Sequence, residues 1–216
     1  MLLQQLQDRL ADIYDLPMDY RVDDFLFTER AHLPLQVRDS NTDEHVLVLD
    51  EGDAAAVGLF LDPQLLARLA AADPIQALHS GNVADYWTAL EGVSHFLYLA
   101  WNAGHDRPVS LLELEMQAEV DKYVASYWLM REQLPGRFPV ELLSLLFERT
   151  RIDSRLARGR ENLYRDASRY AEKFCRRLEH SLRGARGDSS GEVLAELRRF
   201  YRLTNARKVA HIERSE

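Results

Sequence analysis

VADYWTALEGVSHFLYLAWNA, residues 83–103, is the stretch of the chain that best indicates its fold. Apolar side chains recur along it at three- and four-residue spacing, which predicts a helix. Six of these side chains form one face: Val83, Tyr86, Trp87, Leu90, Leu97 and Trp101. Phe96 and Leu99 lie on other sides. A helix that is apolar on nearly every side is usually buried. We therefore expect the rest of the protein to pack around residues 83–103.

A polar stripe runs along this helix beside its apolar face. The stripe consists of residues at spacings of four, three and four: Glu91, His95, Tyr98 and Asn102. Polar groups in a buried helix need partners. The connection from Gly104 to Val109 is short, and short connections favour antiparallel neighbouring helices. We therefore expect the partners to come from the following helix, with His95 level with Glu119.

The following segment, residues 110–133, predicts a helix that begins with a capping box at Ser110 and Glu113. Two acidic residues on one flank of it complete a predicted buried polar cluster, whose members are Glu91, His95, Glu115 and Glu119. Carboxylates and imidazole are the ligands of metal sites in helical bundles, and they also carry out acid–base chemistry. The candidates for binding a divalent metal ion are Glu91, His95 and Glu119. The alternative is that Glu119 satisfies His95 inside an ion-paired core.

The N-terminal part of the chain predicts one helix and then short strands. Apolar residues repeat at helical spacing over residues 2–13, and Leu16-Pro17 ends that helix. Runs of strand type follow at 25–27, 33–37, 46–49 and 55–61. The turn-rich breaks between them predict a small antiparallel β-meander.

From Asp62 onward the pattern predicts helices. Asp62-Pro63 and Asp73-Pro74 each place a capping carboxylate before a proline that suits the first helical position. Later helices are expected at about 83–103, 110–133, 138–150, 154–185 and 190–210. The predicted fold class is α+β and predominantly helical: an N-terminal helix and meander, then a multi-helix bundle with a long C-terminal helical hairpin. The predicted parts are residues 1–61, 62–150 and 151–216, within one compact domain or two closely packed ones.

The basic charge of the chain gathers at its C-terminal end. Residues 1–150 carry a formal net charge of −15, whereas residues 151–216 carry +7. Arginines recur along one face of the predicted hairpin, and the candidates for binding a polyanion are Arg158, Arg165, Arg169, Arg176 and Arg202. Such a stripe can track phosphates. The alternative is a solvated face that docks on acidic residues of the same molecule, because acidic residues four positions earlier neutralise part of it.

The motifs of familiar enzymes are missing from the sequence. It contains no Walker A loop, dinucleotide GxGxxG, HExxH, paired-cysteine zinc spacing or GxSxG elbow. A single cysteine rules out an intramolecular disulfide, and no stretch is long and apolar enough to cross a membrane. We therefore expect a non-catalytic cytoplasmic adaptor or regulator without a cofactor, which acts through charged helical surfaces on an acidic protein partner or on itself. The alternatives are a metal-binding protein or enzyme centred on His95, and a nucleic-acid-binding protein that uses the arginine stripe.

Overall fold

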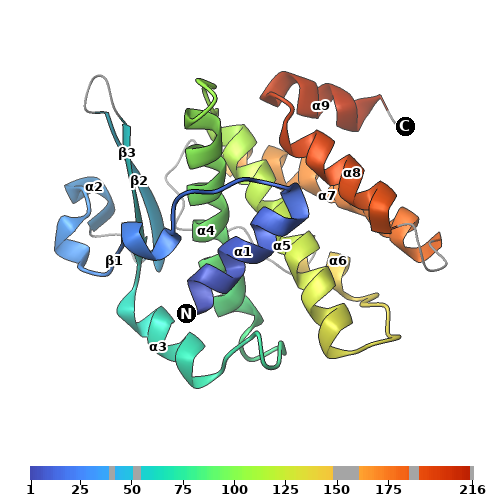
Figure 1. The fold of residues 1–216 in the computed structure, drawn as a ribbon, viewed down its shortest axis with the longest axis horizontal. Helices are drawn as coiled ribbons and strands as arrows, with labels where there is room; N and C mark the ends of the chain where they lie inside the picture. Colours follow the sequence, from blue (N-terminus) through green and yellow to red (C-terminus); the bar gives the residue numbers. More distant parts are fainter. Residues whose placement is uncertain (39–41, 51–54, 148–160, 185–189, 215–216) are drawn as a thin grey trace. The chain divides into compact units, whose positions relative to one another are not determined.

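The computed structural model describes residues 1–38, 42–50, 55–147, 161–184 and 190–214 (Figure 1). Contacts divide the chain into two units: a sheet unit of residues 1–10 and 17–108, and a helical unit of residues 11–16 and 109–216. The α+β, predominantly helical fold class is confirmed. Of the helices in the described ranges, none combines the length and the apolar character that crossing a bilayer requires.

The sheet contains β1 (Leu26–Phe27), β2 (Glu44–Asp50) and β3 (Ala55–Leu61) in the order β1-β3-β2. β2 and β3 are antiparallel, and Glu44 lies opposite Leu61 in their register. β1 runs parallel to β3. The sheet is therefore an antiparallel pair with a short parallel edge strand, and the prediction of an antiparallel meander is wrong in this detail. A parallel neighbour needs a longer connection than a hairpin, and between β1 and β3 the chain passes through α2 and β2.

The strand predicted over residues 33–37 is also wrong, because residues 35–37 are helical. The segment follows a short 3-10 helix, η2 (Arg30–His32), and enters helix α2 (Leu35–Arg38). The carbonyl of Pro34 accepts hydrogen bonds from the amides of Val37 and Arg38. The Arg38 side chain donates to the carbonyls of Ala31 and Leu33. Proline suits a first helical turn, so these local bonds outweigh the apolar strand-like composition.

Helix α4 (Val83–Ala103) packs against β2 and β3, as the ribbon shows (Figure 1). Its buried side chains include Leu90, Val93 and Phe96, and the three residues that end β3, 59–61, are buried as well. The burial predicted for this helix from its apolar pattern is confirmed. Asn82, the residue before α4, makes no side-chain capping bond and instead donates side-chain hydrogen bonds to the carbonyls of Ala72 and Ala77.

Helix α3 (Pro63–Ala71) begins as predicted, because the Asp62 carboxylate accepts a hydrogen bond of 2.8 Å from the Gln64 amide. The similar Asp73-Pro74 pair gives only a turn, in which Asp73 accepts from the Ile75 amide at 2.9 Å.

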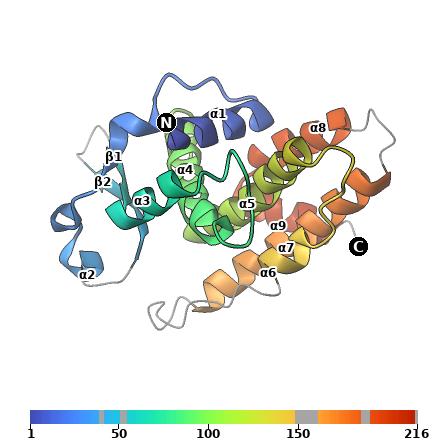
Figure 2. The ribbon, with the colours of Figure 1, turned by 90° about the horizontal axis from the view of Figure 1, so that it is seen from below.

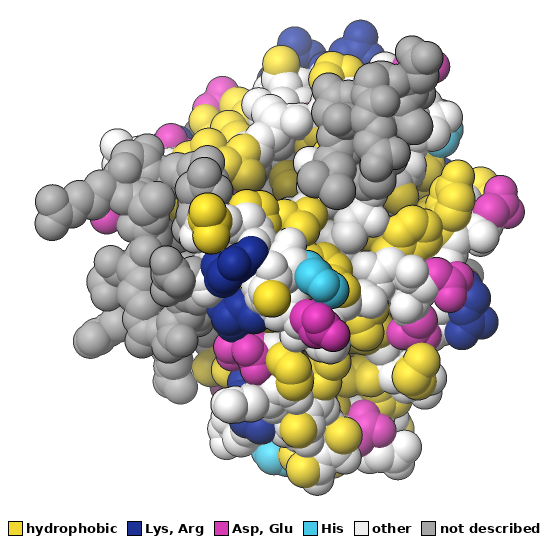
Figure 3. All heavy atoms as spheres, turned by 90° about the vertical axis from the view of Figure 1, so that its left-hand side faces the viewer, with side chains coloured by type: hydrophobic (Ala, Val, Ile, Leu, Met, Phe, Trp, Pro, Cys, Tyr) yellow, Lys and Arg dark blue, Asp and Glu magenta, His cyan; other side chains and the backbone are white. Residues whose placement is uncertain are grey.

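On the face of the sheet unit seen in Figure 3, hydrophobic side chains are interspersed with acidic and basic ones. Two exposed hydrophobic side chains of this unit are Leu35 and Val48.

The helical unit consists of α5, α6, α7, α8, α9 and the residues that end α1 (Figure 2). Their bounds are α1 (Leu2–Tyr14), α5 (Leu111–Gln133), α6 (Leu142–Phe147), α7 (Glu161–Gly184), α8 (Ser190–Tyr201) and α9 (Asn205–Glu213). α5 packs along α7, and α6 contacts both. Ser110 caps α5 through the Glu113 amide at 3.2 Å, as the capping-box spacing predicts. The ring of Phe174 in α7 stacks on that of Phe200 in α8, with centroids 3.9 Å apart.

The single helix predicted over 190–210 is wrong, because the chain breaks between α8 and α9. The amides of Arg202 and Leu203 donate to carbonyls three residues earlier, which tightens and ends α8. The new direction of α9 buries Lys208 and Ile212. The tertiary packing of these two side chains therefore overrides the continuous helical pattern of the sequence.

Two arginines bind the C-terminal end of α1: Arg198 of α8 and Arg202, which directly follows α8. Arg198 donates to the carbonyls of Asp12 and Ile13 at 3.3 and 3.1 Å. Arg202 donates to the carbonyls of Tyr14 and Asp15 at 3.0 Å each. The last carbonyls of a helix have no partner within it, and positive charge is favourable there. These arginines therefore supply both the hydrogen bonds and the charge that the end of α1 needs.

A buried polar network lies at the centre of the helical unit. Lys208 is fully buried. Its Nζ donates a hydrogen bond to Gln117 Oε1 at 2.5 Å and lies 4.8 Å from the ring centroid of Phe200. Gln117 Nε2 donates to Asp121 Oδ1 at 2.7 Å, and the Tyr14 hydroxyl donates to the same carboxylate. Buried charges are stable only when paired or hydrogen-bonded. Gln117 thus links the ammonium of α9 to the carboxylate of α5.

Candidate metal centre

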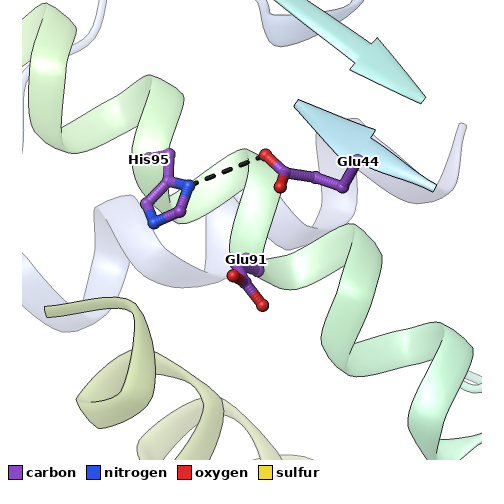
Figure 4. Close-up of side chains that lie close together, drawn as sticks. All are labelled: Glu44, Glu91 and His95. Atoms are coloured by element: carbon purple, nitrogen blue, oxygen red, sulfur yellow. Dashed lines mark ion pairs between the residues drawn. The ribbon is translucent and has the colours of Figure 1, made fainter. Parts of the chain in front are cut away.

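Three side chains with metal-binding atoms converge in the sheet unit: Glu44, Glu91 and His95 (Figure 4). Glu44 is the first residue of β2 and reaches from the strand toward α4. Glu91 and His95 lie one turn apart on α4, and residues four apart share one face of a helix. The cluster therefore joins two elements that are distant in sequence.

The geometry of this cluster is compact and largely shielded from solvent. One potential ligand atom from each residue can be chosen so that all lie within 4.8 Å of one another. His95 Nδ1 and Glu44 Oε1 are 3.6 Å apart, and their side chains are 7% and 13% exposed. Among the described residues, Glu44 Oε1 is buried without a hydrogen bond. A buried carboxylate oxygen without a hydrogen bond carries a desolvation cost that a cation can offset.

Gly92 allows β2 and α4 to approach closely enough for this contact. A Cβ atom at position 92 would lie 2.7 Å from Leu59 Cδ1 and 2.9 Å from Glu44 Cγ. Both distances are shorter than a carbon–carbon contact of about 3.5–4.0 Å. The site therefore requires glycine at position 92, where a side chain would collide with the sheet.

Substitution of Gly92 by Ala is expected to lower the free energy of unfolding by about 1–3 kcal/mol, because it overpacks the contact with buried Leu59. Urea unfolding of the two proteins measures this. Gly104→Ala is the matched control, because the nearest atoms there lie 3.6 Å from the added Cβ. Equal stability of Gly92→Ala and the wild type would contradict the close approach of β2 and α4.

The structure brings together two of the four residues predicted for the polar cluster, Glu91 and His95. The burial predicted for His95 is observed. Glu115 and Glu119 lie on α5 in the helical unit, where Glu119 forms an ion pair of 2.9 Å with Lys122. The grouping of these two glutamates with His95 stays a prediction.

Glu44 is the member of the site that the sequence did not indicate. It precedes Glu91 by 47 positions and belongs to a strand, so no helical spacing relates it to the polar stripe. Its side chain reaches α4 only after β2 has paired with β3 and packed on the helix. The remaining signal in the sequence is Gly92, which is the single glycine within residues 83–103.

The arginines predicted to bind a polyanion occupy different environments. Arg158 lies outside the described residues. On α7, Arg165 donates to Asn162, Arg169 pairs with Asp166 at 3.2 Å, and Arg176 pairs with Glu172 at 2.6 Å. Arg202 holds the end of α1. Binding of a polyanion, and the wider expectation of an interaction protein, stay predictions.

The fold and the site define a class: an α+β protein with a carboxylate–histidine cluster between a strand and a helix. Comparison of the chain with models of protein families, with curated proteins and with solved structures gave no match in any of the three. The function is therefore inferred from the site itself.

Proposed function

We propose that the protein binds a divalent transition metal ion through Glu44, Glu91 and His95. The observation that carries this proposal is the convergence of the three side chains within 4.8 Å on a largely buried position. Ligand atoms bound tetrahedrally at about 2.0–2.2 Å lie about 3.3–3.6 Å from one another. The separation of His95 Nδ1 and Glu44 Oε1, 3.6 Å, already falls in that range.

The donor set favours some metals over others. An imidazole with carboxylates suits Zn²⁺, and also Fe²⁺, Ni²⁺ or Cu²⁺, whereas Mg²⁺ and Ca²⁺ prefer oxygen ligands alone. Three protein ligands leave at least one coordination position for water or a small external ligand. Zn²⁺ is therefore the ion we expect to bind with useful affinity, and Mg²⁺ serves as the comparison.

The position of the ligands gives the bound ion a mechanical role. Glu44 belongs to β2, and Glu91 and His95 belong to α4. A metal ion held by all three ties the β2–β3 pair to the central helix of the sheet unit. Because the unfolded chain lacks this arrangement, binding stabilises the fold, by about 2.7 kcal/mol when the free metal concentration is 100 times Kd.

The test is calorimetric titration of ZnCl₂ into protein that has been stripped of metal with a chelator. We expect one ion per chain for the wild type, and at least about 100-fold weaker binding for His95→Ala, because loss even of a residue behind a ligand costs 10–100-fold. His32→Ala is the matched control: His32 also faces a glutamate, Glu29, at 3.4 Å, but both side chains are exposed. Equal affinity of the wild type and His95→Ala would overturn the proposal.

A further inference from the structure

A second link joins the beginning of β2 to α4, and it is made by Arg68 of α3. The guanidinium donates to both oxygens of Asp85, from Nε at 2.9 Å and from Nη2 at 2.8 Å. Nη2 also donates to Asp43 Oδ2 at 3.2 Å. Asp43 directly precedes Glu44, and Asp85 lies in the first turn of α4. Arg68 thus connects the residue before one ligand to the helix that carries the other two.

The chain before Glu44 is held by further bonds from the same part of the sheet unit. The Asp43 carbonyl accepts from the Asp62 amide at 2.9 Å. The Thr42 carbonyl accepts from Arg30 Nη2 at 2.7 Å, and Arg30 also pairs with the Asp62 carboxylate at 2.9 Å. Beyond Glu44 the strand pairing with β3 takes over. The backbone of Glu44 is therefore fixed from both sides, and Arg68 alone among these contacts spans from β2 to α4.

Arg68 binds Asp85 through two hydrogen bonds and Asp43 through one. Two parallel hydrogen bonds from one guanidinium to one carboxylate set orientation as well as distance. The hydrogen bond to Asp85 raises the pKa of Arg68, so the cation is retained. Arg68 and Asp43 are 46% and 44% exposed, and exposed ion pairs add little to global stability. The clamp therefore acts on local geometry more than on folding.

We propose that Arg68 is a positioning residue of the metal centre, which holds Asp43 against Asp85 so that Glu44 reaches Glu91 and His95. This inference rests on the proposed function. Metal sites need their ligands within about 0.5 Å of the productive geometry. A clamp that fixes the spacing between β2 and α4 meets that need before the metal arrives.

The experiment is the same calorimetric titration with ZnCl₂, applied to variants of the full chain. Arg68→Gln is expected to weaken Zn²⁺ binding by about 10-fold, as removal of a supporting residue does. Asp43→Asn is expected to act in the same direction, because it weakens only the arm toward β2. Arg68→Lys keeps the charge without the planar fork and is expected to fall between Arg68→Gln and the wild type. Arg21→Gln is the control, since the Arg21 side chain is 62% exposed and pairs with Asp23 at 3.8 Å.

A double-variant comparison separates positioning from a general structural effect. If Arg68 acts through Glu44, Arg68→Gln causes no further loss of affinity once Glu44 is already Gln. An equal loss in both backgrounds, or unchanged affinity of Arg68→Gln, overturns the inference and leaves the metal centre itself standing. Absence of Zn²⁺ binding by the wild type overturns the proposed function and this inference with it. Thermal melts of all variants confirm that each is folded at the titration temperature.

Discussion

Replacement of Asp121 by Ala is expected to lower the free energy of unfolding by about 3–5 kcal/mol, because it removes the negative charge from a buried polar network. Asp121 is 1% exposed and accepts hydrogen bonds from Tyr14 and Gln117. Gln117 in turn accepts from the fully buried ammonium of Lys208. The substitution removes the carboxylate that Gln117 links to this buried cation. Urea unfolding followed by circular dichroism measures the change.

Two variants give this prediction its controls. Asp166→Ala breaks an exposed ion pair with Arg169 on α7, and we expect it to cost less than about 1 kcal/mol. Lys208→Met is measured alone and together with Asp121→Ala; the double variant also removes the buried cation and is expected to recover part of the stability. A double variant whose loss equals the two single losses added together would show that Asp121 and Lys208 do not interact.

Raising the pH from 9 to 11 is expected to destabilise the protein by about 5 kcal/mol, through three buried acidic groups of the helical unit. Burial raises the pKa of the Cys175 thiol well above 9.0, and the charges of Glu119 and Asp121 act in the same direction. Burial, and then the charge of Asp121, raises the pKa of Tyr14 well above 10.0. Burial also raises the pKa of Tyr123 above 10.0.

The sign follows from the protons that each state holds. The unfolded chain releases the thiol proton near pH 9 and the tyrosine protons near pH 10, whereas the folded protein keeps them. Stability is therefore complete below about pH 9 and falls above it, by about 1.4 kcal/mol per pH unit for each group. Urea unfolding at pH 8, 9, 10 and 11 tests this. Cys175→Ala is expected to flatten the change between pH 9 and 10, and a constant stability of the wild type up to pH 11 would contradict the burial of these groups.

Local regularities explain which elements were predictable. The helix over residues 2–13 and the buried helix over 83–103 were predicted to within about a residue of α1 and α4. Ser110 and Asp62 cap their helices as their spacing predicts. Each of these features depends on residues within about one helical turn, where a periodic pattern or a capping side chain fixes the backbone. The predicted helix ends were less accurate where the chain leaves the local pattern, as at residues 202–204.

The errors have two physical causes: local hydrogen bonds outweigh apolar composition at residues 33–37, and long-range packing decides the order of the strands. The segment 33–37 has the apolar composition of a strand, yet Pro34 and the hydrogen bonds of Arg38 favour the helix that begins at Leu35. The pairing of β1 with β3 is parallel and joins residues 33 positions apart, Leu26 and Leu59. Strand order of this kind depends on the crossover and on what each face covers, neither of which a local pattern contains.

The sequence by itself determined that residues 83–103 form a buried helix with Glu91 and His95 on one face. Helical periodicity suffices for that, because side chains four residues apart must lie together. Only the tertiary structure decided the third ligand: Glu44 comes from the first residue of β2, and it reaches α4 because Gly92 has no side chain in the way. A strand and a helix meet according to how their surfaces pack, and that contact is a property of the folded chain, with no counterpart in the spacing of the sequence.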